Sequence, residues 1–217
     1  MCIRDSTDMG MFTCRESFGA DASSLFNVLT GYSRPPMYNR LVTAPEGMRE
    51  FFYRMIDGEI ENARLGLPCG IFAKVNSLVD PAIIERLYAA SLSGVPVTLV
   101  VRGICCLIAG VPGISENIRV ISIVGQLLEH SRIFRFENAG KPRLYLGSAD
   151  WMPRNLDRRV ELLFPVEDEH IRARVEESIR LMLEDTVNGR EQLPDGSYPV
   201  SYTHLIRPAG RPLDAAG

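Results

Sequence analysis

Residues 96–101 form a continuous run of apolar and β-branched side chains, Pro-Val-Thr-Leu-Val-Val. Such a run is typical of a central strand that is covered on both faces of a sheet. A second buried strand is predicted at residues 70–78, and Asp80 and Pro81 mark the start of a helix between the two strands. A strand, a helix and a strand in this order make a βαβ unit, which is expected to be right-handed. This feature predicts an α/β fold.

The rest of the chain extends this unit. Strands are predicted at residues 118–124 and 160–166, and residues 132–136 and 143–146 are predicted to form a β-hairpin around a short turn. Further helices are predicted at residues 21–29, 45–65 and 168–187, with Pro45 suited to the start of the second. The expected architecture is an α/β sandwich with a mixed, mostly parallel sheet flanked by helices.

Composition narrows the class of protein. Of the 217 residues, 46% are hydrophobic and 24% are charged, which is an ordinary globular balance. The net charge of -3 argues against a generally basic nucleic-acid binder. Positive charge is nevertheless concentrated between residues 132 and 159, which suits a polyanion site, although scattered surface arginines are an alternative. Five cysteines without a Cys-x-x-Cys pair favour a reduced, cytosolic compartment.

His130 is the sharpest candidate for chemistry. It precedes the first strand of the predicted hairpin, and histidine can exchange a proton or accept a phosphoryl group on nitrogen. Because residues i and i+2 of a strand point to the same face, His130 and Arg132 should project together. The hairpin would bring Gly147 and Ser148 to the same edge of the sheet. A partly exposed structural histidine is the alternative.

Two neighbouring strands carry further candidates. Arg102 follows the buried strand at residues 96–101, where ligands of α/β sheets bind, and a guanidinium can hold phosphate oxygens. Alternatively, Arg102 caps the sheet against a carboxylate. Lys74 and Asn76 share one face of the preceding strand. A lysine inside such an apolar strand needs a partner or a ligand, unless the strand lies at an edge.

Residues after the hairpin are weaker candidates. Ser148 and Asp150 can form hydrogen bonds with an imidazole or a phosphate, and Arg154 suits an anion or an ordinary charged loop. Trp151, the only tryptophan, is expected in the core. The adjacent cysteines at 105 and 106 have no second pair and no nearby histidine, so no metal site is expected there.

Several segments, in one order along residues 7–198, together resemble the C-terminal part of a type 1 polyphosphate kinase. They are Thr7-Asp-Met-Gly-Met-Phe-Thr13, Leu25-Phe-Asn27 with Gly31-Tyr-Ser-Arg-Pro35, Lys74-Val-Asn-Ser-Leu-Val-Asp80, Val101-Arg-Gly-Ile-Cys-Cys-Leu107, Gly113-Ile-Ser-Glu-Asn-Ile-Arg119, Leu128-Glu-His-Ser-Arg132 and Ser148-Ala-Asp-Trp-Met-Pro-Arg-Asn-Leu-Asp-Arg-Arg159.

The resemblance implies a phospholipase D-like domain in an enzyme that reversibly transfers the terminal phosphate of ATP to inorganic polyphosphate, with Mg²⁺, through a phosphohistidine. It implies that Arg102 and His130 bind ATP and that His130 is catalytic, contacting the transferring phosphoryl group as ligand or acid/base. Further candidates for ATP binding are Lys74, Asn76, Arg132, Ser148, Asp150 and Arg154. No residue is assigned to a metal.

The chain divides into four parts, of which the resemblance implies the inner two. Residues 1–6 and 199–217 look like adapter-derived, non-native ends, residues 7–40 like the tail of a preceding catalytic domain with its linker, and residues 41–198 like the C-terminal domain. The family's phosphorylated histidine belongs to the preceding domain, and its nucleotide-contacting tyrosine would fall at Ser6. We therefore expect a fragment that holds half a site and is inactive alone.

Two other functions stay open. The His-x-Arg and Gly-Ser-x-Asp segments are similar to the His-x-Lys and Gly-Ser-x-Asn of phospholipase D-like phosphodiester hydrolases, but both differences argue against hydrolysis. A non-catalytic polyanion-binding module is the other alternative. The expected partners are ATP or ADP, polyphosphate and the preceding domain, with no nucleic acid and with a homo-oligomer in the full-length protein. The expected location is cytoplasmic, with peripheral attachment to the membrane left open.

Overall fold

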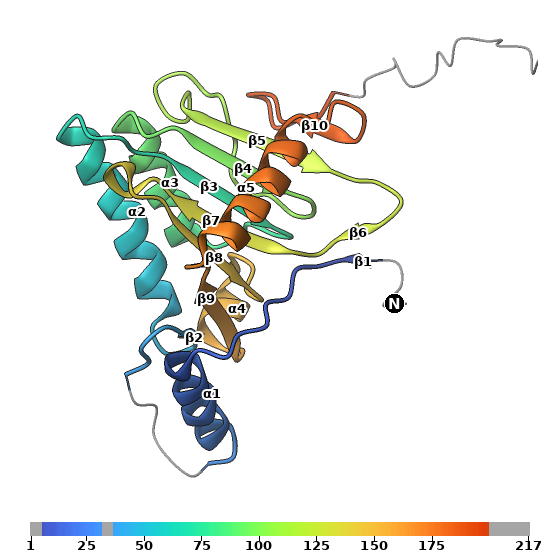
Figure 1. Cartoon of the computed structure of the whole chain (residues 1–217). Coiled ribbons are helices and arrows are strands. Elements are labelled where there is room, and N and C mark those ends of the chain that lie inside the picture. Colours follow the sequence, from blue (N-terminus) through green and yellow to red (C-terminus); the bar gives the residue numbers. More distant parts are fainter. Residues whose placement is uncertain (1–5, 32–36, 200–217) are drawn as a thin grey trace, which may run out of the picture.

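An eight-stranded sheet lies at the centre of the protein (Figure 1). The structure is a computed structural model and describes residues 6–31 and 37–199, so the predicted break at residues 32–36 and most of the predicted leader and tail lie outside the described residues. The strand order is β10-β5-β4-β3-β7-β8-β9-β2. The strands are β2 (Val42–Ala44), β3 (Ile71–Val75), β4 (Val97–Val101), β5 (Ile118–Ile123), β7 (Arg132–Phe136), β8 (Arg143–Gly147), β9 (Glu161–Pro165) and β10 (Gly189–Glu191).

The sheet is mixed, as predicted. In its middle, β3 pairs in parallel with β4, and β4 with β5, as expected for the βαβ unit. The predicted hairpin of β7 and β8 is confirmed, with Arg132 opposite Gly147. The remaining described pairs of this sheet are antiparallel. The expectation of a mostly parallel sheet is therefore wrong, because strands from distant segments join it in antiparallel pairs, such as β7 beside β3 and β2 beside β9.

Helices cover both faces of the sheet (Figure 1). Their apolar side chains form two cores, one beneath α2 and α3 and the other beneath α5. Along β3 the side chains alternate, since Phe72 joins the α5 core and Ala73 joins the α2 and α3 core. This two-sided burial explains the unbroken apolar runs of the central strands. The helices are α1 (Glu16–Leu29), α2 (Met48–Arg64), α3 (Pro81–Leu92), α4 (Pro153–Asp157) and α5 (Glu169–Leu183).

The helix starts follow local chemistry. The predicted cap of α3 is confirmed, because the Asp80 side chain accepts a hydrogen bond of 3.0 Å from the backbone N–H of Ile83. The expectation that α2 starts at Pro45 is wrong. Pro45 lies in the turn after β2, and the helix follows Gly47, whose φ of 98° suits glycine.

Trp151 is fully buried, as predicted. Its ring centroid lies 5.5 Å from that of Phe52 and 5.4 Å from that of Phe134, so it joins α2 to β7. Its backbone carbonyl accepts hydrogen bonds from the N–H groups of Val79 and Asp80. The chain is therefore anchored in the core directly after residue 150.

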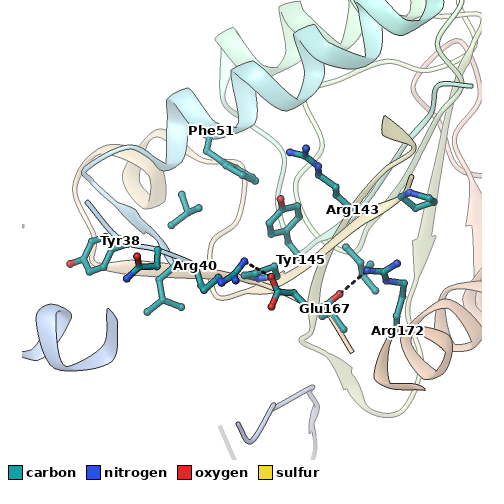
Figure 2. A pocket seen from close by; sticks show the side chains of 14 residues that line it. Tyr38, Arg40, Phe51, Arg143, Tyr145, Glu167 and Arg172 are labelled. Atoms are coloured by element: carbon teal, nitrogen blue, oxygen red, sulfur yellow. Dashed lines mark hydrogen bonds and ion pairs between the residues drawn. The ribbon is translucent and has the colours of Figure 1, made fainter. Parts of the chain in front are cut away.

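Asp21 attaches α1 to the segment that leads into β2. Its side chain is buried, and it accepts hydrogen bonds from the backbone N–H groups of Asn39, Arg40 and Leu41 at 2.9, 2.6 and 3.0 Å. Arg40 itself forms an ion pair of 2.7 Å with Glu167 (Figure 2). Burial opposes ionisation of Asp21, but the hydrogen bonds outweigh it and hold the pKa of this carboxyl below its ordinary value.

We expect Asp21→Asn to destabilise the protein in a pH-dependent way. The amide keeps one acceptor but turns an NH₂ group toward backbone N–H donors, which costs about 2 kcal/mol of unfolding free energy at neutral pH. Because the pKa of Asp21 is lower in the folded state, its contribution is present above about pH 4 and is lost as the pH falls through the folded-state pKa. Urea unfolding of both proteins should show a gap that shrinks on acidification. A gap that is constant with pH would contradict this.

Candidate active site

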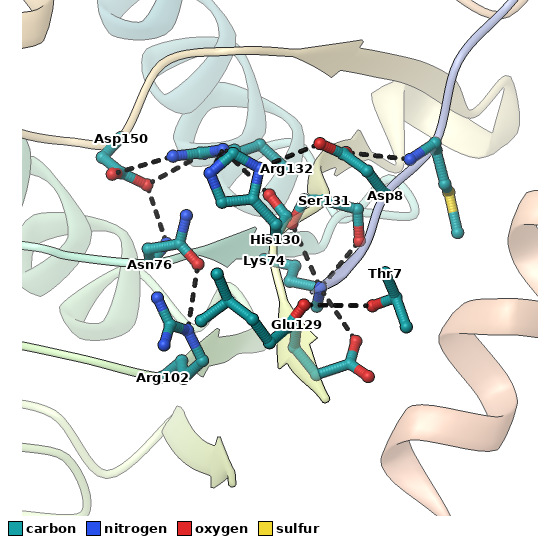
Figure 3. A network of polar contacts seen from close by, with 12 residues as sticks. Thr7, Asp8, Lys74, Asn76, Arg102, Glu129, His130, Ser131, Arg132 and Asp150 are labelled. Atoms are coloured by element: carbon teal, nitrogen blue, oxygen red, sulfur yellow. Dashed lines mark hydrogen bonds and ion pairs between the residues drawn. The ribbon is translucent and has the colours of Figure 1, made fainter. Parts of the chain in front are cut away.

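A polar network lies where the carboxyl ends of β3 and β4 meet the start of β7 (Figure 3). Asn76 follows β3, and Arg102 follows β4. His130 and Arg132 come at the start of β7, and Asp150 comes shortly after β8. Five of the residues predicted from the sequence are therefore brought to one edge of the sheet. Gly147, which was predicted at the same edge as His130, pairs with Arg132.

Lys74 forms the buried base of this network. Only 2% of the residue is exposed. Its ammonium group donates to the Ser131 hydroxyl at 2.7 Å and lies 3.3 Å from a carboxylate oxygen of Glu129. Burial lowers the pKa of Lys74, and the charge of Glu129 opposes that shift. The prediction that this lysine needs a partner is confirmed, and the alternative of an edge strand is wrong, because β3 lies between β4 and β7.

The two residues that hold Lys74 are those on either side of His130. A short strand, β6 (Leu128–Glu129), pairs there in parallel with β1 (Ser6–Thr7), and the backbone N–H of His130 donates to the Thr7 carbonyl at 3.0 Å. With Glu129 and Ser131 turned toward Lys74, the His130 side chain points away from it, toward Asp8 and Arg132 (Figure 3). The buried lysine thus fixes the direction of the histidine.

Asp8 orients the imidazole ring. One of its carboxylate oxygens lies 2.9 Å from Nδ1 of His130. A carboxylate only accepts hydrogen bonds, so Nδ1 carries the proton of this contact. In the neutral ring, Nε2 then presents its lone pair. Burial opposes ionisation of Asp8, but its hydrogen bonds, led by that from His130, lower the pKa of this carboxyl overall.

Arg132 lies against the same ring. Its Nη1 is 3.1 Å from both ring nitrogens of His130 and donates to the His130 carbonyl at 2.9 Å. An atom in the ring plane and equally near both nitrogens would collide with the carbon between them, so Nη1 lies over the ring face. The predicted projection of the two side chains to one face is confirmed. Among the described residues, Nε2 has no hydrogen-bond partner other than this arginine.

Asp150 connects the hairpin to the parallel strands. It receives Nε and Nη2 of Arg132 at 3.2 and 3.3 Å, and the backbone N–H of Asn76 at 2.7 Å. The Asn76 side-chain oxygen in turn accepts a bond of 3.2 Å from Nε of Arg102. Asp150 and Arg132 both have side chains that are 11% exposed, so their ion pair is well shielded from water.

Arg102 is the cation of this network that keeps free donors. It is half-buried, and within the described ranges it forms an amide contact but no ion pair with a carboxylate. The backbone approaches closely here, because the Gly103 N–H donates to the Asn76 carbonyl at 2.7 Å and a Cβ at residue 103 would lie 2.7 Å from that oxygen. Glycine therefore lets the two strand ends meet.

Two predicted site residues lie elsewhere. The Ser148 hydroxyl donates to Glu161 and accepts from the backbone N–H of Leu162, so it links β8 to β9. Arg154 is exposed on α4. For the described residues, no side-chain contact joins Ser148 or Arg154 to the polar network, and their assignment to the site stays a prediction.

Sequence reasoning missed Asp8 as a site residue. It also missed Ser131 as a partner of Lys74. Asp8 lies 122 positions from His130 in sequence, and periodicity carries no signal for that contact. The one available signal was the Thr-Asp pair at the start of the segments that resemble polyphosphate kinases.

The carboxylates of the network do not form a metal site. Within the described ranges, no group of three His, Cys, Asp or Glu side chains is arranged to hold a metal ion. Asp8, Glu129 and Asp150 are instead each engaged by a side chain of the network.

Among the described residues, every helix is too short or too polar to span a membrane.

A comparison with models of protein families shows which family this chain belongs to. The family model described as polyphosphate kinase C-terminal domain 2 matches residues 41–205. The chain belongs to this family.

Two curated relatives and one solved structure support the same family. The polyphosphate kinase of Thermosynechococcus vestitus is 53% identical over 191 residues, which are 88% of this chain and 26% of the relative. That of Lactiplantibacillus plantarum is 51% identical, covering 88% and 27%. The crystal structure of polyphosphate kinase from Porphyromonas gingivalis matches with a TM-score of 0.83 and 36% identity, covering 89% of this chain and 31% of that one. The chain thus spans about a quarter of the length of these curated relatives.

We expect Asp8→Ala to change the tautomer of His130. At a pH at which the ring is neutral, Asp8 holds the proton on Nδ1, and its removal should move protons toward Nε2. The ¹⁵N shifts of the two ring nitrogens report this directly. Asp57→Ala, which removes an exposed carboxylate on α2, is the matched control and should leave the shifts unchanged. Identical ring shifts in all three proteins would refute the assigned contact.

Proposed function

We propose that this chain is the phosphate-binding part of a kinase that reversibly transfers the terminal phosphate of ATP to inorganic polyphosphate. The observation that carries the proposal is the convergence of Arg102, His130 and Arg132 at one edge of the sheet. Phosphoryl transfer depends mostly on positioning and on stabilisation of charge, and these are the side chains it requires. Membership of the polyphosphate kinase family supports this chemistry.

Arg102 would hold phosphate oxygens of ATP. Its Nε is committed to Asn76, which orients the guanidinium, while the terminal nitrogens keep their donors. Arg132 is instead neutralised by Asp150, so its main role would be to position His130. Lys74 and Asn76 would support the site from below, through Ser131 and Asp150.

His130 would contact the transferring phosphoryl group through Nε2. With Nδ1 held by Asp8, the neutral ring can accept a proton at Nε2, and the protonated ring can donate one there. In the proposed reaction the bond from the terminal phosphorus of ATP to its bridging oxygen breaks, and a bond to a histidine nitrogen of the preceding domain forms. That bond then breaks as a terminal oxygen of polyphosphate takes the phosphoryl group.

The preceding domain and Mg²⁺ would complete the site. Because Asp8 comes before residue 41 and still contacts His130, the segment at residues 7–40 fits the tail of a catalytic domain that adjoins this edge. Mg²⁺ would neutralise the phosphates of ATP, as is common for this ion, and its protein ligands would belong to the preceding domain. A homo-oligomer and a cytoplasmic location belong to the same proposal.

A chimaera tests the catalytic role. Residues 6–199 would replace the matching segment of the Thermosynechococcus vestitus polyphosphate kinase, and transfer of γ-labelled phosphate from ATP into long-chain polyphosphate would be measured. We expect the chimaera to be active and His130→Ala to reduce transfer by a factor of about 100 or more. His170→Ala, at an exposed histidine on α5, is the control and should be neutral. Near-normal transfer by the His130 variant would exclude the role.

The isolated chain should bind polyphosphate without transferring phosphate. Arg102→Gln removes the charged donors, so we expect the Kd for tripolyphosphate to rise about tenfold, with weaker binding in high salt. Isothermal titration calorimetry measures both effects. Arg64→Gln, at an exposed arginine at the end of α2, should change little. Affinity that is indifferent to both salt and Arg102→Gln would remove the anion-site argument.

A further inference from the structure

A cavity lies at the end of β8 that is farther from the candidate active site, and Figure 2 shows the residues that line it. Its volume is about 430 Å³, within the range of small-ligand sites. Three segments supply its charged walls, namely the approach to β2 with Arg40, the start of β8 with Arg143, and the junction of β9 and α5 with Glu167 and Arg172. Tyr145 and Phe51 line its apolar side.

The cavity is separate from the polar network. Arg143 is the first residue of β8 and pairs with Phe136, whereas Gly147 is the last and pairs with Arg132. Four steps along a strand correspond to about 13 Å. None of the network residues around His130 lines the cavity. An anion bound here would therefore occupy a different site.

The charges of the cavity are unbalanced. Glu167 is its one lining carboxylate, and two arginines already neutralise it, since Arg40 and Arg15 each approach it to 2.7 Å. Across residues 6–31 and 37–199, neither Arg143 nor Arg172 forms an ion pair with a carboxylate. The cavity thus carries two guanidinium groups without counter-charges.

The geometry of these groups leaves donors unused. Nε of Arg172 is buried and has no hydrogen-bond partner among the described residues, and its Nη2 reaches the Val166 carbonyl only at 3.5 Å. Arg143 is exposed and contacts the Tyr145 phenol. The Tyr145 ring is packed edge-on against Phe51, with centroids 4.9 Å apart, and both rings line the cavity beside Arg143. Among the described residues, the guanidinium of Arg172 therefore has the Val166 carbonyl as its hydrogen-bond partner and no carboxylate.

We propose that this cavity is a second anion site, which binds a phosphate-bearing ligand through Arg143 and Arg172. A terminal phosphate has three acceptor oxygens and can meet planar guanidinium groups from two directions at once. The Tyr145 phenol adds a further donor at the wall. Two ligands share this chemistry, namely a free oligophosphate chain and the phosphate tail of a nucleotide.

The test is a titration of the ¹⁵N-labelled chain with tripolyphosphate and, separately, with ATP. The amides of Arg143, Leu144 and Tyr145 report on the cavity, and those of Asn76 and Gly103 report on the candidate active site. We expect saturable shifts in the cavity group, and the ligand with the lower Kd there identifies the source of the phosphate. Shifts confined to the active-site group, or absent from both groups, would overturn the second site.

Variants separate the two sites. Arg143→Gln alters an exposed side chain and should raise the Kd read at the cavity amides about tenfold, as expected for loss of a charge-assisted contact. Arg172→Gln should act in the same direction, with thermal unfolding as a check on its fold. If Arg172→Gln does not fold, the Kd of Arg143→Gln alone decides whether the cavity binds the anion. Arg64→Gln should have no effect, and Arg102→Gln should weaken only the active-site response.

The outcomes also distinguish this site from the proposed function. A cavity response that persists in Arg102→Gln and is lost in Arg143→Gln supports an independent second site. Loss in Arg102→Gln with full retention in both cavity variants overturns the second site and leaves the proposed function intact. A cavity Kd that is equal in wild type and Arg143→Gln would likewise refute the proposal.

Discussion

The buried charge of Lys74 is the constraint on which the site depends. All five residues of β3 are buried, because helices cover both faces of the sheet. An ammonium group at this position is unfavourable unless partners replace its water. Glu129 and Ser131 supply them, and they do so only if the start of β7 lies beside β3. The direction of His130, which stands between these two residues, follows from satisfying the lysine.

A second constraint comes from two adjacent residues, Asp150 and Trp151, which connect the polar network to the hydrophobic core. Trp151 is buried between α2 and β7, while Asp150 holds Arg132 and the backbone of Asn76. Packing of the indole therefore sets the position of a carboxylate at the edge of the site. Because Asp150 neutralises Arg132, the guanidinium with free donors in this network is that of Arg102. The division between a positioning arginine and an anion-binding arginine is thus a consequence of the fold.

Much of the fold could be predicted because its signals are local. The βαβ unit, the hairpin, the cap of α3 at Asp80 and the buried Trp151 each follow from composition or spacing within a few residues. The start of α2 was misplaced because a proline also suits the turn before a helix, and the glycine that follows adopts the required φ. The direction of strand pairing was misjudged because it depends on how strands from different segments assemble.

The sequence by itself determined that Lys74 needs a partner, that His130 and Arg132 project together, and that Arg102 ends a buried strand. These conclusions rest on the two-residue repeat of strands and on the cost of burying charge, which act locally. Only the tertiary structure decided that Asp8 orients His130, that Ser148 links β8 to β9, and that Arg143 and Arg172 line a cavity with little counter-charge. Those contacts join segments far apart in the chain, and no local rule specifies which distant side chain completes a hydrogen bond or an ion pair.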